Sequence, residues 1–162
     1  MLLLLERPWL WKAVCDAVTL EAALLSWRQS HRTVEVFVLD GRAMRTSAGF
    51  YDEFARALAL PDYFGRNLNA LGECLADPDV MRGGGFAILI RHGAEMLCEA
   101  PAEALDGAVD TLEAAGAEWA VPVTTGNAGD RPAAPFHTIV QLDRSAGRLA
   151  DLPSFATVAK PR

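Results

Sequence analysis

Two kinds of hydrophobic pattern alternate along the chain, and the first of them predicts three strands. Nearly continuous apolar runs are typical of strands that are buried on both faces of a sheet. They occur in VEVFVL at residues 34–39, in GGGFAILI at residues 83–90 and in FHTIVQL at residues 136–142. Residues with turn preference flank these runs, and Asp40 with Gly41 ends the first of them.

The second pattern places apolar residues three and four positions apart, as on the buried face of a helix. It predicts one helix before the first strand, two between the first and second strands, and one between the second and third. The helix before the first strand has a capping residue in Thr19, and the next starts at Thr46 or Ser47 and stops before Pro61. The last of them begins at Pro101 and ends at Gly116.

Strands separated by helices imply parallel pairing with right-handed crossovers, so we expect an α/β fold with a three-stranded parallel sheet. Two segments fit neither pattern. Residues 8–14 are apolar without a clear period and form either a short strand or a packed arm, while residues 122–135 have loop composition. We expect one structural domain, in which residues 1–33 are an N-terminal extension packed on the domain of residues 34–162.

Charge and composition narrow the class of partner. The chain of 162 residues has 15 basic and 21 acidic side chains, a net charge of −6. Nucleic-acid binding depends on clustered Lys and Arg, which this chain lacks, so a cationic protein is the better partner. The opening MLLLL ends at Glu6, too short for a signal peptide or a membrane span. We therefore expect a cytoplasmic protein that binds neither nucleic acid nor a membrane.

The spacing of cysteine and histidine residues gives no indication of a metal site or of a redox-active disulfide. The three cysteines, Cys15, Cys74 and Cys98, are far apart and form no CxxC motif, so we expect them to be reduced and buried. His31 and His92 each have a glutamate nearby, but neither has a second His or Cys at ligand spacing. We expect no metal and no cofactor.

The segment LPDYFGRNLNALGECL at residues 60–75 breaks a local rule. Its leucines Leu68, Leu71 and Leu75 share one helix face, which leaves Asn69, Gly72 and Glu73 together on the opposite face. A glycine inside a helix costs about 1 kcal/mol relative to alanine. Such a penalty on the face turned away from the core indicates a functional surface.

Aromatic and acidic residues surround this segment. Tyr63 and Phe64 precede Gly65 in a loop, where no periodic pattern buries both rings. Four acids and one base lie between residues 62 and 79, a local charge of −3. An aromatic anchor beside carboxylates suits an interface with a cationic protein. The alternative is structural, with Phe64 in the core, Tyr63 half-buried and the acids on a solvated face.

The same residues resemble the barstar family of intracellular ribonuclease inhibitors. The likeness rests on LDG at residues 39–41, on ALALP at residues 57–61 and above all on LPDYFGRNLNALGECL. It implies a three-stranded parallel sheet covered by helices, and no enzymatic activity. It also implies that a loop and the following helix enter the cationic cleft of a ribonuclease, where an acidic side chain takes a phosphate position.

The resemblance assigns partner-binding roles residue by residue. Tyr63 matches the family's loop tyrosine, Gly65 the glycine whose backbone contacts the enzyme, and Asn67 the asparagine that starts the helix. Three positions depart from the family pattern: Asn69 and Glu73 stand where it has aspartates, and Gly72 stands where it has a tryptophan. We therefore expect an immunity-type inhibitor of a basic ribonuclease or ribonuclease-type toxin other than barnase itself, and we favour a monomer.

Two other hypotheses stay open at this stage. His92 and Glu95 follow the strand at residues 83–90, where α/β enzymes often place an acid and a base, so a small hydrolase is one alternative. The other is a domain that keeps the barstar fold but has lost inhibition, because a fold does not determine a function.

Overall fold

A single parallel sheet organises the chain, whose computed structural model describes residues 5–126, 129–143, 149 and 151–152. The sheet has four strands in the order β1-β4-β3-β2, and every neighbouring pair is parallel. The strands are β1 (Leu10–Val14), β2 (Val34–Asp40), β3 (Gly85–Arg91) and β4 (Phe136–Leu142).

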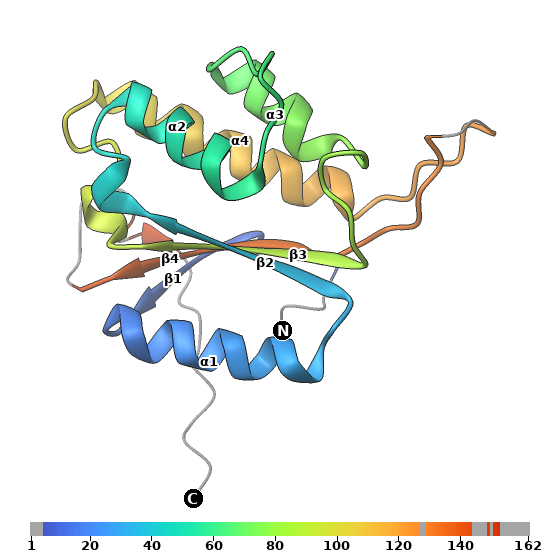
Figure 1. Ribbon diagram of the computed structural model, residues 1–162, viewed down its shortest axis with the longest axis horizontal. Coiled ribbons are helices and arrows are strands. Elements are labelled where there is room, and N and C mark those ends of the chain that lie inside the picture. The colour runs from blue at the N-terminus through green and yellow to red at the C-terminus, as the bar shows by residue number, and fades with distance from the viewer. Residues whose placement is uncertain (1–4, 127–128, 144–148, 150, 153–162) are drawn as a thin grey trace, which may run out of the picture.

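Helices cover both faces of this sheet (Figure 1). One face carries α2 (Ser47–Leu58), α3 (Leu68–Ala76) and α4 (Ala102–Trp119), and the other carries α1 (Ala17–Ser30). Two short 3₁₀ helices, η1 (Gly41–Ala43) and η2 (Gly93–Glu95), follow β2 and β3. The surface of α3 therefore lies on the opposite side of the sheet from α1.

Two clusters of buried side chains hold these layers together. The larger lies between the sheet and α2, α3 and α4, and includes Phe50, Phe54, Phe86 and Phe136, each at most 1% exposed. The smaller cluster lies between α1 and the other face of the sheet. Because α3 contributes to the larger cluster, burial of apolar surface fixes its inner face.

The expected count of three strands was one too low. The segment left open at residues 8–14 forms the fourth strand, β1, which pairs with the free side of β4. Leu10, Trp11 and Ala13 are buried, so apolar side chains point to both faces and the strand shows no period-two pattern. The division of the chain at residue 33 into an extension and a domain stays a prediction. In the structure, β1 is a strand of the sheet and α1 covers one of its faces.

Several sequence expectations need correction in detail. β2 is an edge strand whose central residues are only half-buried, because it has a neighbour on one side alone. Asp16, and not Thr19, caps α1: its carboxylate accepts the Thr19 backbone N–H at 2.8 Å. Gly116 does not end α4, which continues to Trp119; the glycine lies against Trp9, whose Cβ would be 2.5 Å from a Cβ at this position.

The cysteines also differ from expectation, since Cys98 is exposed and Cys15 and Cys74 are half-buried; all three are free. In the loop between α4 and β4, Val123 and Arg131 form an antiparallel β-bridge. Among the residues that the structure describes, none of the helices is long and apolar enough to span a membrane.

Candidate partner-binding site

The loop between α2 and α3 presents one aromatic side chain to solvent and buries the next. α2 ends at Ala59 in the left-handed conformation, and the Phe64 backbone N–H then donates to the Pro61 carbonyl at 2.9 Å. This turn directs Phe64 into the core at 8% exposure and leaves Tyr63 84% exposed. The structural alternative is therefore right for Phe64 and wrong for Tyr63, whose exposed ring is typical of an interface anchor.

Asn67 joins this loop to α3. Its Oδ1 accepts the backbone N–H of Ala70 at 2.9 Å, which caps the helix, and its Nδ2 donates to the Gly65 carbonyl at 3.1 Å. Arg66 adopts a positive φ of 49° between them and forms an ion pair with Asp52 on α2. The side chain of Asn67 is thus occupied within the chain, so it positions the loop through these bonds.

The two faces of α3 are as the sequence predicts. Leu71 and Leu75 are fully buried, and Leu68 is half-buried at the start of the helix. Asn69 and Glu73 are exposed on the other side, and Gly72 between them is half-buried. Among the residues that the structure describes, no ion pair or hydrogen bond engages the carboxylate of Glu73.

α3 is held against α4 at both of its ends. The indole Nε1 of Trp119 donates to the Leu75 carbonyl at 2.7 Å, so α4 satisfies one of the last carbonyl groups of α3. At the other end, Leu68 packs against Gly107 of α4. A Cβ added to Gly107 would lie 2.5 Å from the Cδ1 atom of Leu68. The exposed face of α3 is therefore presented from a fixed position.

The charge of this surface is mostly negative. Asp62 and Glu73 are exposed, and Asp77 and Asp79 follow at the C-terminal end of α3. The single base of the segment, Arg66, is already paired with Asp52. A cationic protein would meet carboxylates that Arg66 does not neutralise, which favours fast association.

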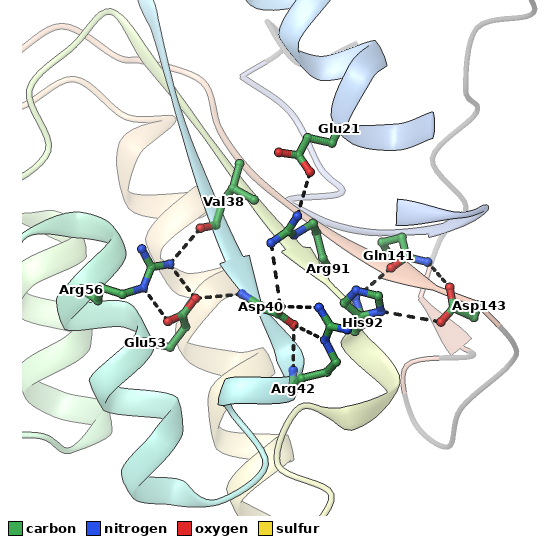
Figure 2. Close-up of polar contacts among 10 residues, drawn as sticks. All are labelled: Glu21, Val38, Asp40, Arg42, Glu53, Arg56, Arg91, His92, Gln141 and Asp143. Carbon is green, nitrogen blue, oxygen red and sulfur yellow. Dashed lines mark hydrogen bonds and ion pairs between the residues drawn. The ribbon is translucent and has the colours of Figure 1, made fainter. Parts of the chain in front are cut away.

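A second polar cluster lies at the carboxyl edge of the sheet, where α/β enzymes commonly bind ligands (Figure 2). Asp40 at the end of β2 accepts hydrogen bonds from Arg42 at 2.9 to 3.2 Å, and Arg91 lies 3.8 Å from it. Arg91 also bonds Glu21 of α1 at 2.8 Å. The hydrogen bond from the Arg42 side chain keeps the pKa of Asp40 below its usual value.

Glu53 extends the cluster toward α2. Its carboxylate accepts the Asp40 backbone N–H at 2.9 Å and two bonds from Arg56 at 2.7 Å (Figure 2). The hydrogen bonds with Arg56 lower the pKa of Glu53 despite its burial. Since these carboxylates are paired with cations of the same chain, the cluster ties α1 and α2 to the sheet.

The acid and base of the hydrolase hypothesis are not brought together. His92 has a positive φ of 50°, and its Nδ1 lies 3.8 Å from Asp143, while its backbone N–H donates to Gln141 at 2.8 Å. Glu95 forms an ion pair with Arg45 instead. Both side chains are described, and no hydrogen bond joins them. The pair on which that hypothesis rests is therefore not formed.

Sequence reasoning missed the part of the candidate site that α4 contributes. A hollow of about 340 Å³ lies between α3 and α4, with Asn69, Gly72 and Glu73 on one side. Thr111, Ala114 and Glu118 are among the residues that line the other side. These residues lie about forty positions further along the chain. The helix predicted for this stretch ends at Gly116, before Glu118, and nothing local in the sequence pointed to these residues.

Comparison with known proteins agrees with this geometry. A search of curated protein sequences finds no match to the chain. The family model described as Barstar (barnase inhibitor) matches residues 34–140, which is well over half of the chain and includes β2, β3, most of β4 and the whole candidate site. The chain therefore belongs to the barstar family, an inhibitor family whose members bind ribonucleases.

Proposed function

We propose that the protein inhibits a basic ribonuclease or ribonuclease-type toxin by inserting the α2–α3 loop and the exposed face of α3 into its active-site cleft. Tyr63, Gly65, Asn69, Gly72 and Glu73 form the contact surface, and Asn67 positions it. The observation that carries this proposal is Glu73, an exposed carboxylate without a partner among the described residues, on a helix that α4 holds in place.

A ribonuclease cleft binds phosphate with Arg, Lys and His side chains, and a carboxylate that enters it forms charge-assisted hydrogen bonds with the same groups. Glu73 supplies the negative charge, while Tyr63 adds a large contact area at a low entropic cost because it has few rotatable bonds. Substrate RNA is excluded because the inhibitor occupies its place. In this proposal the protein acts as a monomer inside the cell that produces the nuclease.

The departures at Asn69 and Gly72 specify a target other than barnase. Asn69 forms hydrogen bonds but carries no charge, so the complementary cleft needs fewer cationic groups. Gly72 has no aromatic side chain, so the surface of the ribonuclease comes closer to α3 at this position. We expect Gly72→Trp to weaken binding to the native target through a clash and to raise the affinity for barnase.

The test is inhibition of RNA hydrolysis by a panel of basic microbial ribonucleases, with barnase as the reference. The expected result is stoichiometric inhibition of at least one enzyme by the native protein, and weak or no inhibition of barnase. Glu73→Gln should reduce this inhibition strongly, because it removes the carboxylate that the proposal places among the cations of the cleft.

Glu21→Gln is the matched control for Glu73→Gln. Glu21 lies on α1, on the opposite face of the sheet from α3, and the change removes the same single charge from the protein. The new side chain keeps an amide oxygen that can accept the hydrogen bond from Arg91. A protein that binds none of the panel, or whose inhibition is equally sensitive to both changes, contradicts the proposal.

A further inference from the structure

α1 carries apolar side chains on two faces, and only one of these faces packs against the sheet. The inner face is buried through Leu20 and Leu24. The outer face has a second apolar stripe at helical spacing, formed by Val18, Ala22 and Leu25. All three are exposed, Val18 at 78% and Leu25 at 47%. A helix at a protein surface normally has a polar outer face, so this stripe needs a separate explanation.

The outer stripe ends at a hollow near the C-terminal end of α1. The hollow has a volume of about 460 Å³ and is lined by Leu25, Arg28, Gln29 and Arg32. Arg28 lies in the last turn of α1, and Arg32 lies just beyond the end of the helix at Ser30. Because Leu25 belongs to both the stripe and the hollow, the two form one continuous surface along the outer face of the helix.

The two arginines of the hollow have no partner within the part of the chain that the structure describes. Arg28 and Arg32 are exposed, and no hydrogen bond or ion pair engages either guanidinium. The helix dipole attracts a cation in the last turn, which accounts for Arg28 but not for Arg32 beyond the helix end. Five arginines elsewhere each form an ion pair with a carboxylate of the chain, namely Arg42, Arg45, Arg56, Arg66 and Arg91. The hollow is therefore a local site of unpaired positive charge on a protein whose net charge is −6.

A carboxylate beside an apolar side chain is the ligand that these groups fit. The two guanidinium groups and the Gln29 amide donate hydrogen bonds to a carboxylate, while Leu25 and the stripe cover apolar carbon. Nucleic acid fits poorly, because it binds through many phosphate contacts, leaves the stripe without a partner and is repelled by the net charge. A membrane surface also fits poorly, because such helices bury a wide apolar face and α1 already uses one face in the core. An acidic and apolar segment of another protein matches both the charge and the stripe.

We propose that the outer face of α1 binds an acidic amphipathic segment of a second partner protein. Apolar side chains of that segment pack on Val18, Ala22 and Leu25, and one of its carboxylates enters the hollow between Arg28 and Arg32. Because α1 and α3 lie on opposite faces of the sheet (Figure 1), the segment and a ribonuclease do not compete for the same surface. α1 also precedes residue 34, where the match to the family model begins. The proposal is thus independent of ribonuclease inhibition and gives α1 a binding role of its own.

A first experiment probes the hollow with a small molecule. N-acetyl-leucine, which has an apolar side chain beside a carboxylate, is titrated into the ¹⁵N-labelled protein, and the neutral N-acetyl-leucine amide is the control compound. We expect saturable millimolar shifts of the Leu25, Gln29 and Arg32 amide signals with the carboxylate alone, and Arg32→Gln should abolish the shifts. Equal shifts with both compounds, or no saturable shifts with either, would overturn the proposal.

Arg42→Gln is the matched control for Arg32→Gln. Each change removes one positive charge from an exposed arginine. Arg42 follows β2 and Arg32 precedes it, so the two lie at opposite edges of the sheet. Titration of the Arg42→Gln protein should give the native shifts. If Arg42→Gln loses them as Arg32→Gln does, the effect is one of net charge and the hollow is not the site.

A second experiment tests the whole surface with a short amidated helical peptide that carries leucines along one face and glutamates beside them. Arg32→Gln and Leu25→Gln should each raise the dissociation constant of this peptide by about tenfold or more. Arg42→Gln and Val121→Gln, which change exposed residues outside α1, should each alter it by less than about twofold. Vesicles of phosphatidylcholine and phosphatidylserine in equal parts, and a single-stranded RNA, test the two other classes of partner. Tighter binding to either of these than to the peptide, or a peptide affinity that neither α1 variant changes, would overturn the proposal.

Discussion

Replacing Gly72 by alanine should make the free protein more stable. The residue lies inside α3 with a Cβ position 3.8 Å from its nearest neighbour, so the added methyl group meets no clash. Alanine is favoured over glycine in a helix interior by about 1 kcal/mol, partly because the unfolded glycine chain has more freedom to lose. For a chain of this length, about 1 kcal/mol corresponds to a rise in melting temperature of roughly 2 to 4 °C.

Gly116→Ala is the matched control on the neighbouring helix. It has the same propensity gain, but its Cβ would lie 2.5 Å from the Trp9 Cβ and 2.6 Å from its Cγ. Overpacking of this kind costs about 1 to 3 kcal/mol, so the net effect should be a loss of stability. Thermal unfolding followed by circular dichroism or calorimetry measures both variants. A Gly72→Ala protein that melts below the native protein would refute this reasoning, because it would show that the fold requires a glycine at this position.

Three further predictions concern the loop, the polar cluster and the approach of the partner. Asn67→Ala should lower the free energy of unfolding by about 1 kcal/mol through loss of the α3 cap, whereas the exposed Asn69→Ala should change it by less than about 0.5 kcal/mol; chemical denaturation distinguishes them. The lowered pKa of Glu53 stabilises the fold above its unfolded pKa of about 4.3, and this contribution is lost as the pH falls through the lower folded value. Glu53→Gln should therefore weaken the fall in stability between about pH 5 and pH 3, and an unchanged pH profile of urea unfolding would contradict this. The association rate with a basic ribonuclease should fall steeply between about 0.1 M and 1 M salt as the Debye length shrinks from about 10 to 3 Å, and stopped-flow rates that do not depend on salt would remove the steering argument.

The strands and most helices could be predicted because their hydrophobic patterns report burial directly. The runs at residues 34–39, 83–90 and 136–142 all became strands of the sheet, and Thr46 caps α2 as expected. Residues 8–14 could not be assigned, because a strand with apolar side chains on both faces and no flanking turn signal has the same composition as a packed arm. Thr19 was mistaken for a cap because Asp16, three residues earlier, is also a residue that caps helices; its carboxylate accepts the Thr19 backbone N–H, which places Thr19 inside the first turn.

The candidate site was predictable only where it is local in sequence. Tyr63, Asn69, Gly72 and Glu73 lie within one short segment, and the helical period alone places the last three on one exposed face. The contribution of α4 depends on how two helices pack, and that is fixed by tertiary contacts such as the Trp119 hydrogen bond to Leu75. Glu118 therefore emerges only from the structure.

The central claim, that the exposed face of α3 binds a basic ribonuclease through Glu73, is tested most directly by isothermal titration of Glu73→Gln against an enzyme that the native protein inhibits. Removing the charge leaves cationic groups of the enzyme buried without a partner, a loss of about 2 to 5 kcal/mol, or roughly 30-fold to several thousand-fold in affinity. The free variant should unfold within about 0.5 kcal/mol of the native protein, because Glu73 is exposed and unpaired among the described residues. A folded Glu73→Gln protein that binds as tightly as the native protein would contradict the account.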